Sequence, residues 1–130
     1  MKLKIAGLIL VAVVATAAAI PVAMASSGGR QIVPLKPTRA FPAAKGKAKF
    51  EAKKDERQLE VEVEHIRRLK GQRVTVFVGG AKLGSVRVNA FGAAELERNS
   101  ERGQLVPPVS AGTKVVVRTA RSAAIVAGSF

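Results

Sequence analysis

Hydrophobic and polar residues alternate along most of the chain after residue 45. In residues 47–53, Ala48, Phe50 and Ala52 share one face, and lysines and a glutamate share the other. In residues 58–64, leucine and valines alternate with glutamates in the same way. A period of two predicts half-buried strands, and the polar residues 54–57 predict a tight turn between them. We therefore expect an antiparallel hairpin whose lysine row faces a glutamate row on the solvent side, which fixes the register.

The same alternation continues in the second half of the chain. Val74, Val76 and Val78 give a strand its inner face, and Gly79-Gly80 supplies the positive φ angles that a hairpin turn requires before a return strand at 83–89. Further strands are predicted around residues 93–97 and 115–117, and a last one follows at 123–130. We expect an all-β antiparallel sandwich or small barrel of seven or eight strands over residues 46–130.

An internal repeat is a further hypothesis from this pattern. Residues 46–51 align with 92–97, and residues 71–76 align with 112–117. The chain would then contain two degenerate four-strand units. Pro107-Pro108 stands where the second strand of the first unit stands, so we expect an edge or a loop there.

The first 25 residues have the layout of a secretory signal peptide. Lys2 and Lys4 precede the apolar residues 5–20, Pro21 ends that run, and Ala23-Met24-Ala25 matches a small-x-small cleavage site. We expect a secreted or periplasmic protein, with removal of the two lysines lowering the formal net charge from +13 to +11. The alternative is an uncleaved helix that anchors the chain to the inner membrane, since residues 5–25 could just span a bilayer.

Residues 26–45 are expected to form a basic, proline-rich linker. Pro34, Pro37 and Pro42 argue against a helix and against a central strand. The apolar residues among them allow part of the linker to lie along the domain as an edge segment.

The arrangement of these segments resembles that of uncharacterised small secreted bacterial β-proteins. The resemblance covers most of the chain after the signal peptide and implies export and a β-repeat fold, without an activity or site residues. It is carried by residues 46–51, 60–63, 74–80, 92–97 and 128–130.

The composition argues against an enzyme. The chain has no cysteine, one histidine and one aspartate, Asp55, which lies in a predicted turn. His65 is expected at the rim of the core on the face of Leu59, without an identifiable nucleophile beside it. Glu60, Glu62 and Glu64 lie in a flat row that converges poorly on a cation, and lysines are expected to face them. We therefore predict no catalytic residues, no metal and no cofactor, and no small-molecule substrate is identifiable.

The excess of basic residues points to polyanions. Residues 79–84, GGAKLG, superficially resemble a phosphate-binding loop, but they lack its spacing and are expected to be a hairpin turn. The candidate anion-binding residues occupy two turns that could meet at one end of the sandwich, namely Arg67, Arg68, Lys70, Arg73 and Lys82.

Two functions stay open at this point. The first is an exported non-enzymatic module with a binding or structural role in the cell envelope or outside the cell, whose partner is a protein, an anionic polymer or an anionic membrane surface. The alternative is a dedicated polyanion-binding protein for nucleic acid or acidic polysaccharide. Steep weakening by salt would favour the second.

Overall fold

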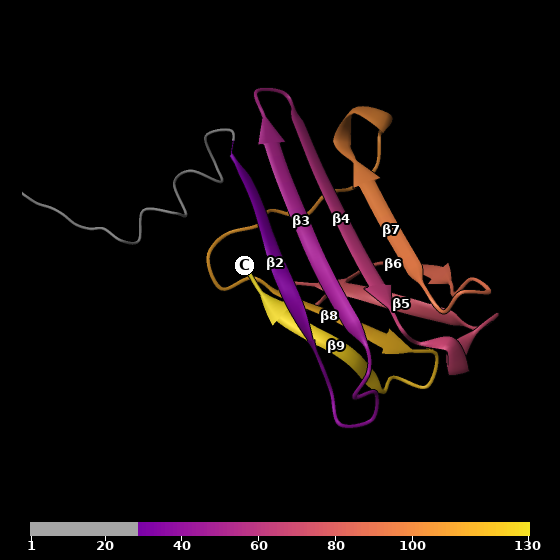
Figure 1. The fold of residues 1–130 in the computed structure, drawn as a ribbon. Helices are drawn as coiled ribbons and strands as arrows, with labels where there is room; N and C mark the ends of the chain where they lie inside the picture. Colours follow the sequence, from indigo (N-terminus) through magenta and orange to yellow (C-terminus); the bar gives the residue numbers. More distant parts are fainter. Residues whose placement is uncertain (1–28) are drawn as a thin grey trace, which may run out of the picture.

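The computed structural model describes residues 29–130 and confirms the predicted all-β fold (Figure 1). The predicted signal peptide and the first three residues of the predicted linker lie outside the described residues. Two short 3-10 helices, η2 (Arg67–Leu69) and η3 (Ser100–Arg102), interrupt the strands. The strands are β2 (Arg30–Pro37), β3 (Lys45–Lys53), β4 (Glu56–Glu64), β5 (Arg73–Val78), β6 (Ala81–Arg87), β7 (Ala94–Asn99), β8 (Lys114–Thr119) and β9 (Ala124–Ser129).

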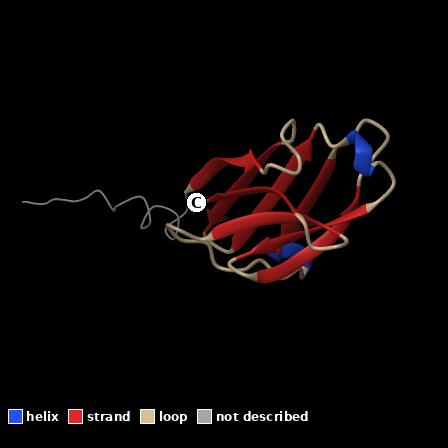
Figure 2. Ribbon diagram, turned by 90° about the horizontal axis from the view of Figure 1, so that it is seen from below, coloured by secondary structure: helices blue, strands red, loops and turns tan. Residues whose placement is uncertain are grey.

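The eight strands form one antiparallel sheet in the order β6-β5-β8-β9-β2-β3-β4-β7. The sheet curls until its two edge strands, β6 and β7, approach each other, which gives a nearly closed barrel (Figure 2). Arg98 of β7 lies over Gly84 of β6 at this seam, where a side chain on Gly84 would collide with the guanidinium. The glycine therefore lets the two edges come together.

Strand β2 corrects the predicted linker. Residues Arg30–Pro37 are not a linker or an edge segment but a strand between β9 and β3, so the folded unit begins before residue 46. Pro34 is tolerated because each residue of β2 is paired on one side only. The strand pairs with β3 from Arg30 to Leu35 and with β9 only at Lys36 and Pro37. A residue without an N–H therefore stands where the strand has a neighbour on one side.

The predicted register of the β3–β4 hairpin is confirmed. Lys47 is opposite Glu62 and Lys49 is opposite Glu60. Their charged atoms lie 3.6 Å and 3.1 Å apart on the outer face of the sheet. The alternate residues point inward, where Leu59 and Val61 are at most 2% exposed.

The core fills the inside of the curled sheet with side chains from every strand except β6, whose Leu83 and Val86 are only partly buried against it. Phe50 packs edge-on against Phe130, with ring centroids 6.4 Å apart. Residues 104–110 form no strand, as the two prolines predicted, yet Val106 and Val109 are buried and cover the core. The second of the two predicted units thus lacks a counterpart of β4, and the internal repeat stays a hypothesis. Within residues 29–130, no helix has the length and apolar character needed to cross a membrane.

The junction of β2 and β9 generates a stability prediction. A Cβ atom on Gly128 would lie 2.7 Å from the carbonyl oxygen of Pro34 and 2.9 Å from Leu35 Cδ2. Gly128→Ala should therefore lower the free energy of unfolding by about 1–3 kcal/mol, as overpacking does, although alanine normally favours a strand over glycine. Urea unfolding followed by circular dichroism measures the change. Ser129→Ala, at the exposed neighbouring position, should change it by less than about 0.5 kcal/mol, and equal effects of the two substitutions would contradict the packing argument.

Candidate functional site

Four loops meet at one end of the barrel because every neighbouring pair of strands is antiparallel. They are the connections β2–β3 (residues 38–44), β4–β5 (65–72), β6–β7 (88–93) and β8–β9 (120–123). In Figure 1 they lie along the bottom and right of the barrel. We call this surface the basic loop end. The other three connections and both ends of the folded unit lie at the opposite end.

Hydrogen bonds join these four loops to one another. Thr38 donates its N–H to the carbonyl of Ile125 at 3.1 Å and its hydroxyl to that of Ala124 at 2.7 Å. Ile66 N–H donates to the carbonyl of Gly92 at 3.0 Å. Ala124 and Ile125 begin β9 directly after the β8–β9 loop, and a hydrogen bond from Arg68 to the carbonyl of Ala40 links the β4–β5 loop to the β2–β3 loop. The loops therefore form one connected surface.

The four loops of the basic loop end carry positive charge and contain no acid, and Glu64 at the adjoining end of β4 is exposed beside them. Its loops contain five exposed basic residues and no aspartate or glutamate: Arg39, Arg67, Arg68, Lys70 and Arg121. The loops at the opposite end balance Lys54 and Arg102 against Asp55 and Glu101. Among residues 29–130, the loops at one end thus carry a net positive charge, whereas those at the other end are balanced.

The structure brings together four of the five predicted anion-binding residues. Arg67, Arg68 and Lys70 lie in the β4–β5 loop, and Arg73 begins β5 directly after it. Lys82 does not join them, because it follows the β5–β6 turn at the opposite end of the same hairpin. That turn has Gly79 and Gly80 at positive φ, so residues 79–84 are the predicted hairpin turn and not a phosphate-binding loop.

Sequence reasoning missed Arg39, Arg87 and Arg121 at this surface. All three are exposed, and Arg87 at the end of β6 stands directly opposite Arg73. Counting strands could have found them, because alternate connections of an all-antiparallel sheet lie at the same end. That count required β2, which the prolines concealed.

Local contacts hold two of these arginines in place. The guanidinium of Arg68 stacks on the ring of Phe41, 4.1 Å from its centroid, and donates a hydrogen bond to the carbonyl of Ala40. Arg87 Nη1 donates to the carbonyl of Gly71 at 2.6 Å. Because their side chains are already ordered, these residues lose less conformational entropy when they bind a ligand.

A pocket of about 270 Å³ opens beside Arg68, between the β2–β3 and β4–β5 loops. Phe41, Pro42 and Ile66 contribute to its walls. His65 also lines it, which corrects the expected position at the rim of the core. The residue has a φ of 64°, so the alternation of β4 ends there, and Ile66 takes the buried place instead.

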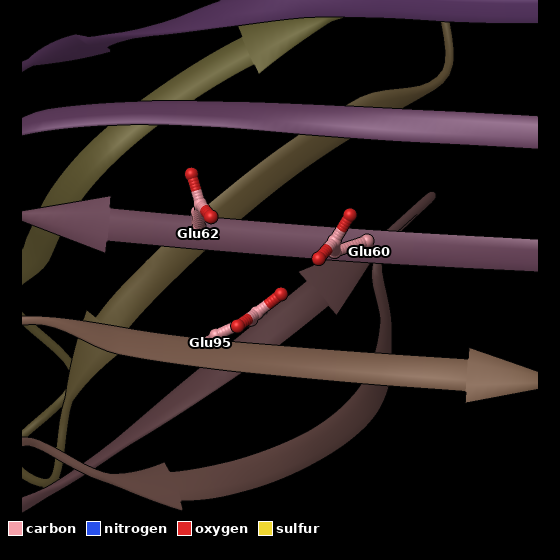
Figure 3. Close-up of side chains that lie close together, drawn as sticks. All are labelled: Glu60, Glu62 and Glu95. Atoms are coloured by element: carbon pink, nitrogen blue, oxygen red, sulfur yellow. The ribbon is translucent and has the colours of Figure 1, made fainter.

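A second cluster lies on the outer face of β4 and β7 (Figure 3). Carboxylate oxygens of Glu60, Glu62 and Glu95 lie within 4.8 Å of one another. The sequence predicted a flat row of glutamates on one strand that converges poorly. Strand β7 changes this, because it places Glu95 opposite Glu62. Lys47 and Lys49 flank the cluster from β3 and supply positive charge.

Crowding of these carboxylates changes their acidity. A side-chain hydrogen bond with Glu60, helped by partial burial and by the charges of Glu60, Glu62 and Glu97, raises the pKa of Glu95 to about 7. The same hydrogen bond, helped by Lys49 and opposed by partial burial, lowers the pKa of Glu60. Glu60 and Glu95 therefore share one proton near neutral pH.

Comparisons with protein-family models, with curated proteins and with solved structures found no match for this chain. The resemblance to small secreted bacterial β-proteins therefore stays a prediction.

The shared proton predicts how stability depends on pH. The pKa of Glu95 is raised from its ordinary value of 4.5 to about 7, so the folded chain binds more protons than the unfolded chain between these pH values. The stability that this group contributes is fully present below pH 4.5 and is lost as the pH rises to 7. The lowered pKa of Glu60 acts in the opposite sense, but below pH 4.5. Glu95→Gln should remove this loss of stability at high pH. It should raise the melting temperature at pH 8 by about 2–5 °C, with little change at pH 5.

Thermal unfolding at pH 5 and pH 8 measures this effect. Glu51→Gln provides the control, because Glu51 lies on the same outer face opposite Gln58 rather than a second acid. An equal gain at pH 8 from both substitutions would indicate general charge reduction and contradict the shared proton.

Proposed function

We propose that this protein is an exported, non-enzymatic module that binds an anionic polymer through the basic loop end. One observation carries the proposal: four loops from distant parts of the sequence meet with five exposed basic residues and no acid among them. Like charges repel, so gathering them at one end lowers the stability of the fold. A bound anion would neutralise these charges and remove the repulsion. An anionic polymer supplies many charges at the spacing that such a surface can meet.

The kind of basic residue supports an oxyanion ligand. Four of the five exposed basic residues in the four loops are arginines, and Arg73 and Arg87 adjoin them on β5 and β6, whereas Lys45 begins β3. The planar guanidinium offers a fork of donors that matches phosphate, sulfate or carboxylate oxygens. Arg73 and Arg87 stand directly opposite each other on β5 and β6, which is unfavourable without an anion. A bound oxyanion near both would relieve that repulsion.

The titratable groups support a role other than catalysis. The imidazole of His65 lies 3.9 Å from the carboxylate of Glu64, and its side chain is 63% exposed. The Glu60–Glu62–Glu95 cluster stands on the outer face of the sheet, where Glu62 and Glu95 line a pocket of only about 120 Å³. General acid–base catalysis relies on a base that the protein holds and orients beside its substrate. His65 and Glu95 are both exposed to solvent, so we expect neither to act as a catalytic acid or base.

Two variants of equal charge test the proposal. The loop-end variant Arg67→Gln/Lys70→Gln/Arg121→Gln removes three positive charges from the basic loop end. The control variant Lys54→Gln/Lys82→Gln/Arg102→Gln removes three from the opposite end. We expect only the loop-end variant to weaken heparin binding clearly. It should lower the slope of log affinity against log salt by roughly two, because fewer counterions are released.

Binding is measured by titration with heparin at several salt concentrations. Elution from a cation exchanger without phosphate or sulfate groups should be similar for the two variants, because it reports net charge. Equal weakening of heparin binding would mean that only net charge matters, and the proposed site would be abandoned. Salt-insensitive binding would point to a protein partner instead.

Export is tested separately, by expressing the whole chain in a bacterium and determining the mass of the recovered protein. We expect a product that begins at Ser26 in the periplasm or medium, because Ala23-Met24-Ala25 fits the shallow pocket of the signal peptidase. Replacing Ala23 and Ala25 by arginine should block processing. A full-length chain in the membrane fraction would support the uncleaved anchor, and a full-length cytoplasmic chain would refute export.

A further inference from the structure

We propose that the anionic polymer is a single-stranded nucleic acid, with Phe91 as the platform on which an unpaired base stacks. This inference rests on the proposed function, because the basic loop end must first bind the phosphates. It assigns a role to an exposed aromatic residue that charge alone does not explain.

Phe91 is a large apolar side chain that is 78% exposed at the tip of the β6–β7 loop. The loop that holds it is tightly bonded. The side-chain oxygen of Asn89 accepts hydrogen bonds from the N–H of Phe91 at 2.9 Å and from that of Ala93 at 3.1 Å. The N–H of Asn89 donates to the carbonyl of Ala93 at 2.9 Å. The ring therefore projects from an ordered turn, which reduces the entropy lost when a ligand stacks on it.

The neighbouring residue places the loop of Phe91 against Arg67. Gly92 has a φ of 79°, and a Cβ atom there would lie only 2.6–2.8 Å from atoms of Arg67. The β6–β7 loop thus packs directly on the start of η2. Phe91 is the residue directly before Gly92, so the loop position that carries this ring is next to the one that contacts Arg67.

The pocket of about 270 Å³ extends this surface on the other side of Arg67. Arg67 and Arg68 both line it, together with Phe41 and Pro42. Arg68 is exposed although its guanidinium rests on Phe41, and guanidinium planes stack on bases as aromatic rings do. A strand whose phosphates follow the arginines could place one base on Phe91 and the next against this pocket.

These features favour a nucleic acid over other polyanions. An unpaired base offers a π face to a phenyl ring, whereas a sugar ring offers only C–H groups and paired bases in a duplex keep their faces covered. A membrane-binding surface needs several protruding apolar side chains. Of the three large hydrophobic residues exposed in the described part of the chain, only Phe91 is at this end. Ile32 lies on the outer face of β2, and Leu105 lies in the β7–β8 loop at the opposite end.

The test compares two labelled strands with equal numbers of phosphates, a thymidine 12-mer and an abasic 12-mer, by fluorescence anisotropy with the purified protein at one salt concentration. We expect the thymidine strand to bind about fivefold tighter or more, which is the effect of stacking one base. Phe91→Ala should remove this difference and leave binding of the abasic strand and of heparin unchanged. The control Leu105→Ala removes an equally exposed apolar side chain at the opposite end and should bind as the unaltered protein does.

The outcomes separate this inference from the proposed function. Equal affinity for both strands, or no effect of Phe91→Ala, overturns base stacking. If the loop-end variant still binds both strands more weakly than the unaltered protein, the polyanion site stands without base stacking. If neither strand nor heparin distinguishes the loop-end variant from its charge-matched control, both proposals fall. If the Phe91→Ala variant loses binding to phosphatidylglycerol vesicles but still binds the thymidine strand as the unaltered protein does, Phe91 belongs to a membrane-binding surface and the inference is refuted.

Discussion

The pairing of β2 with both β3 and β9 is the constraint on which the rest of the structure depends. β2 joins the β3-β4-β7 side of the sheet to the β9-β8-β5-β6 side, and without it these two halves have no shared strand. The join also sets the direction of every strand relative to its neighbours. The β2–β3 and β8–β9 loops consequently lie next to each other, tied through Thr38. The composite charged surface is thus a consequence of closing the sheet.

The molecule separates two kinds of charge by two different means. On the outer face, acids are close enough to repel, and the repulsion is relieved within the chain by Lys47, Lys49 and the proton shared by Glu60 and Glu95. The loops of the basic loop end contain no acid, and Arg68 and Arg87 are held there by carbonyl oxygens and, for Arg68, by the face of Phe41. The first cluster is internally compensated, whereas the second is ordered without being neutralised. This difference is why the basic loop end, and not the acidic cluster, is the better candidate for a charged partner.

Local patterns in the sequence predicted the hairpins. The composition of the two charged clusters and the place of β2 depend on strand pairing between distant parts of the chain. The rows of Lys47 and Lys49 against Glu62 and Glu60 defined a register because a slip of one residue would turn valines outward. Arg67 to Arg73 could be grouped because they are close in sequence. Glu95 joins Glu60 only through the pairing of β4 with β7, which alternation within a strand does not encode. The prolines of β2 argued locally against a strand, and only the one-sided pairing at Pro34 removes that objection.

The polar side chains near Phe91 bear on what kind of recognition this surface can perform. Reading a base edge requires a free amide or carboxylate, as asparagine and glutamine provide. Asn89 is the nearest such side chain in sequence, and its oxygen already accepts two backbone N–H groups of its own loop. Stacking on Phe91 accepts the face of any base, and arginines bind phosphates that every nucleotide shares. A surface built in this way would hold a single strand with little preference for sequence, and its affinity would follow strand length and salt.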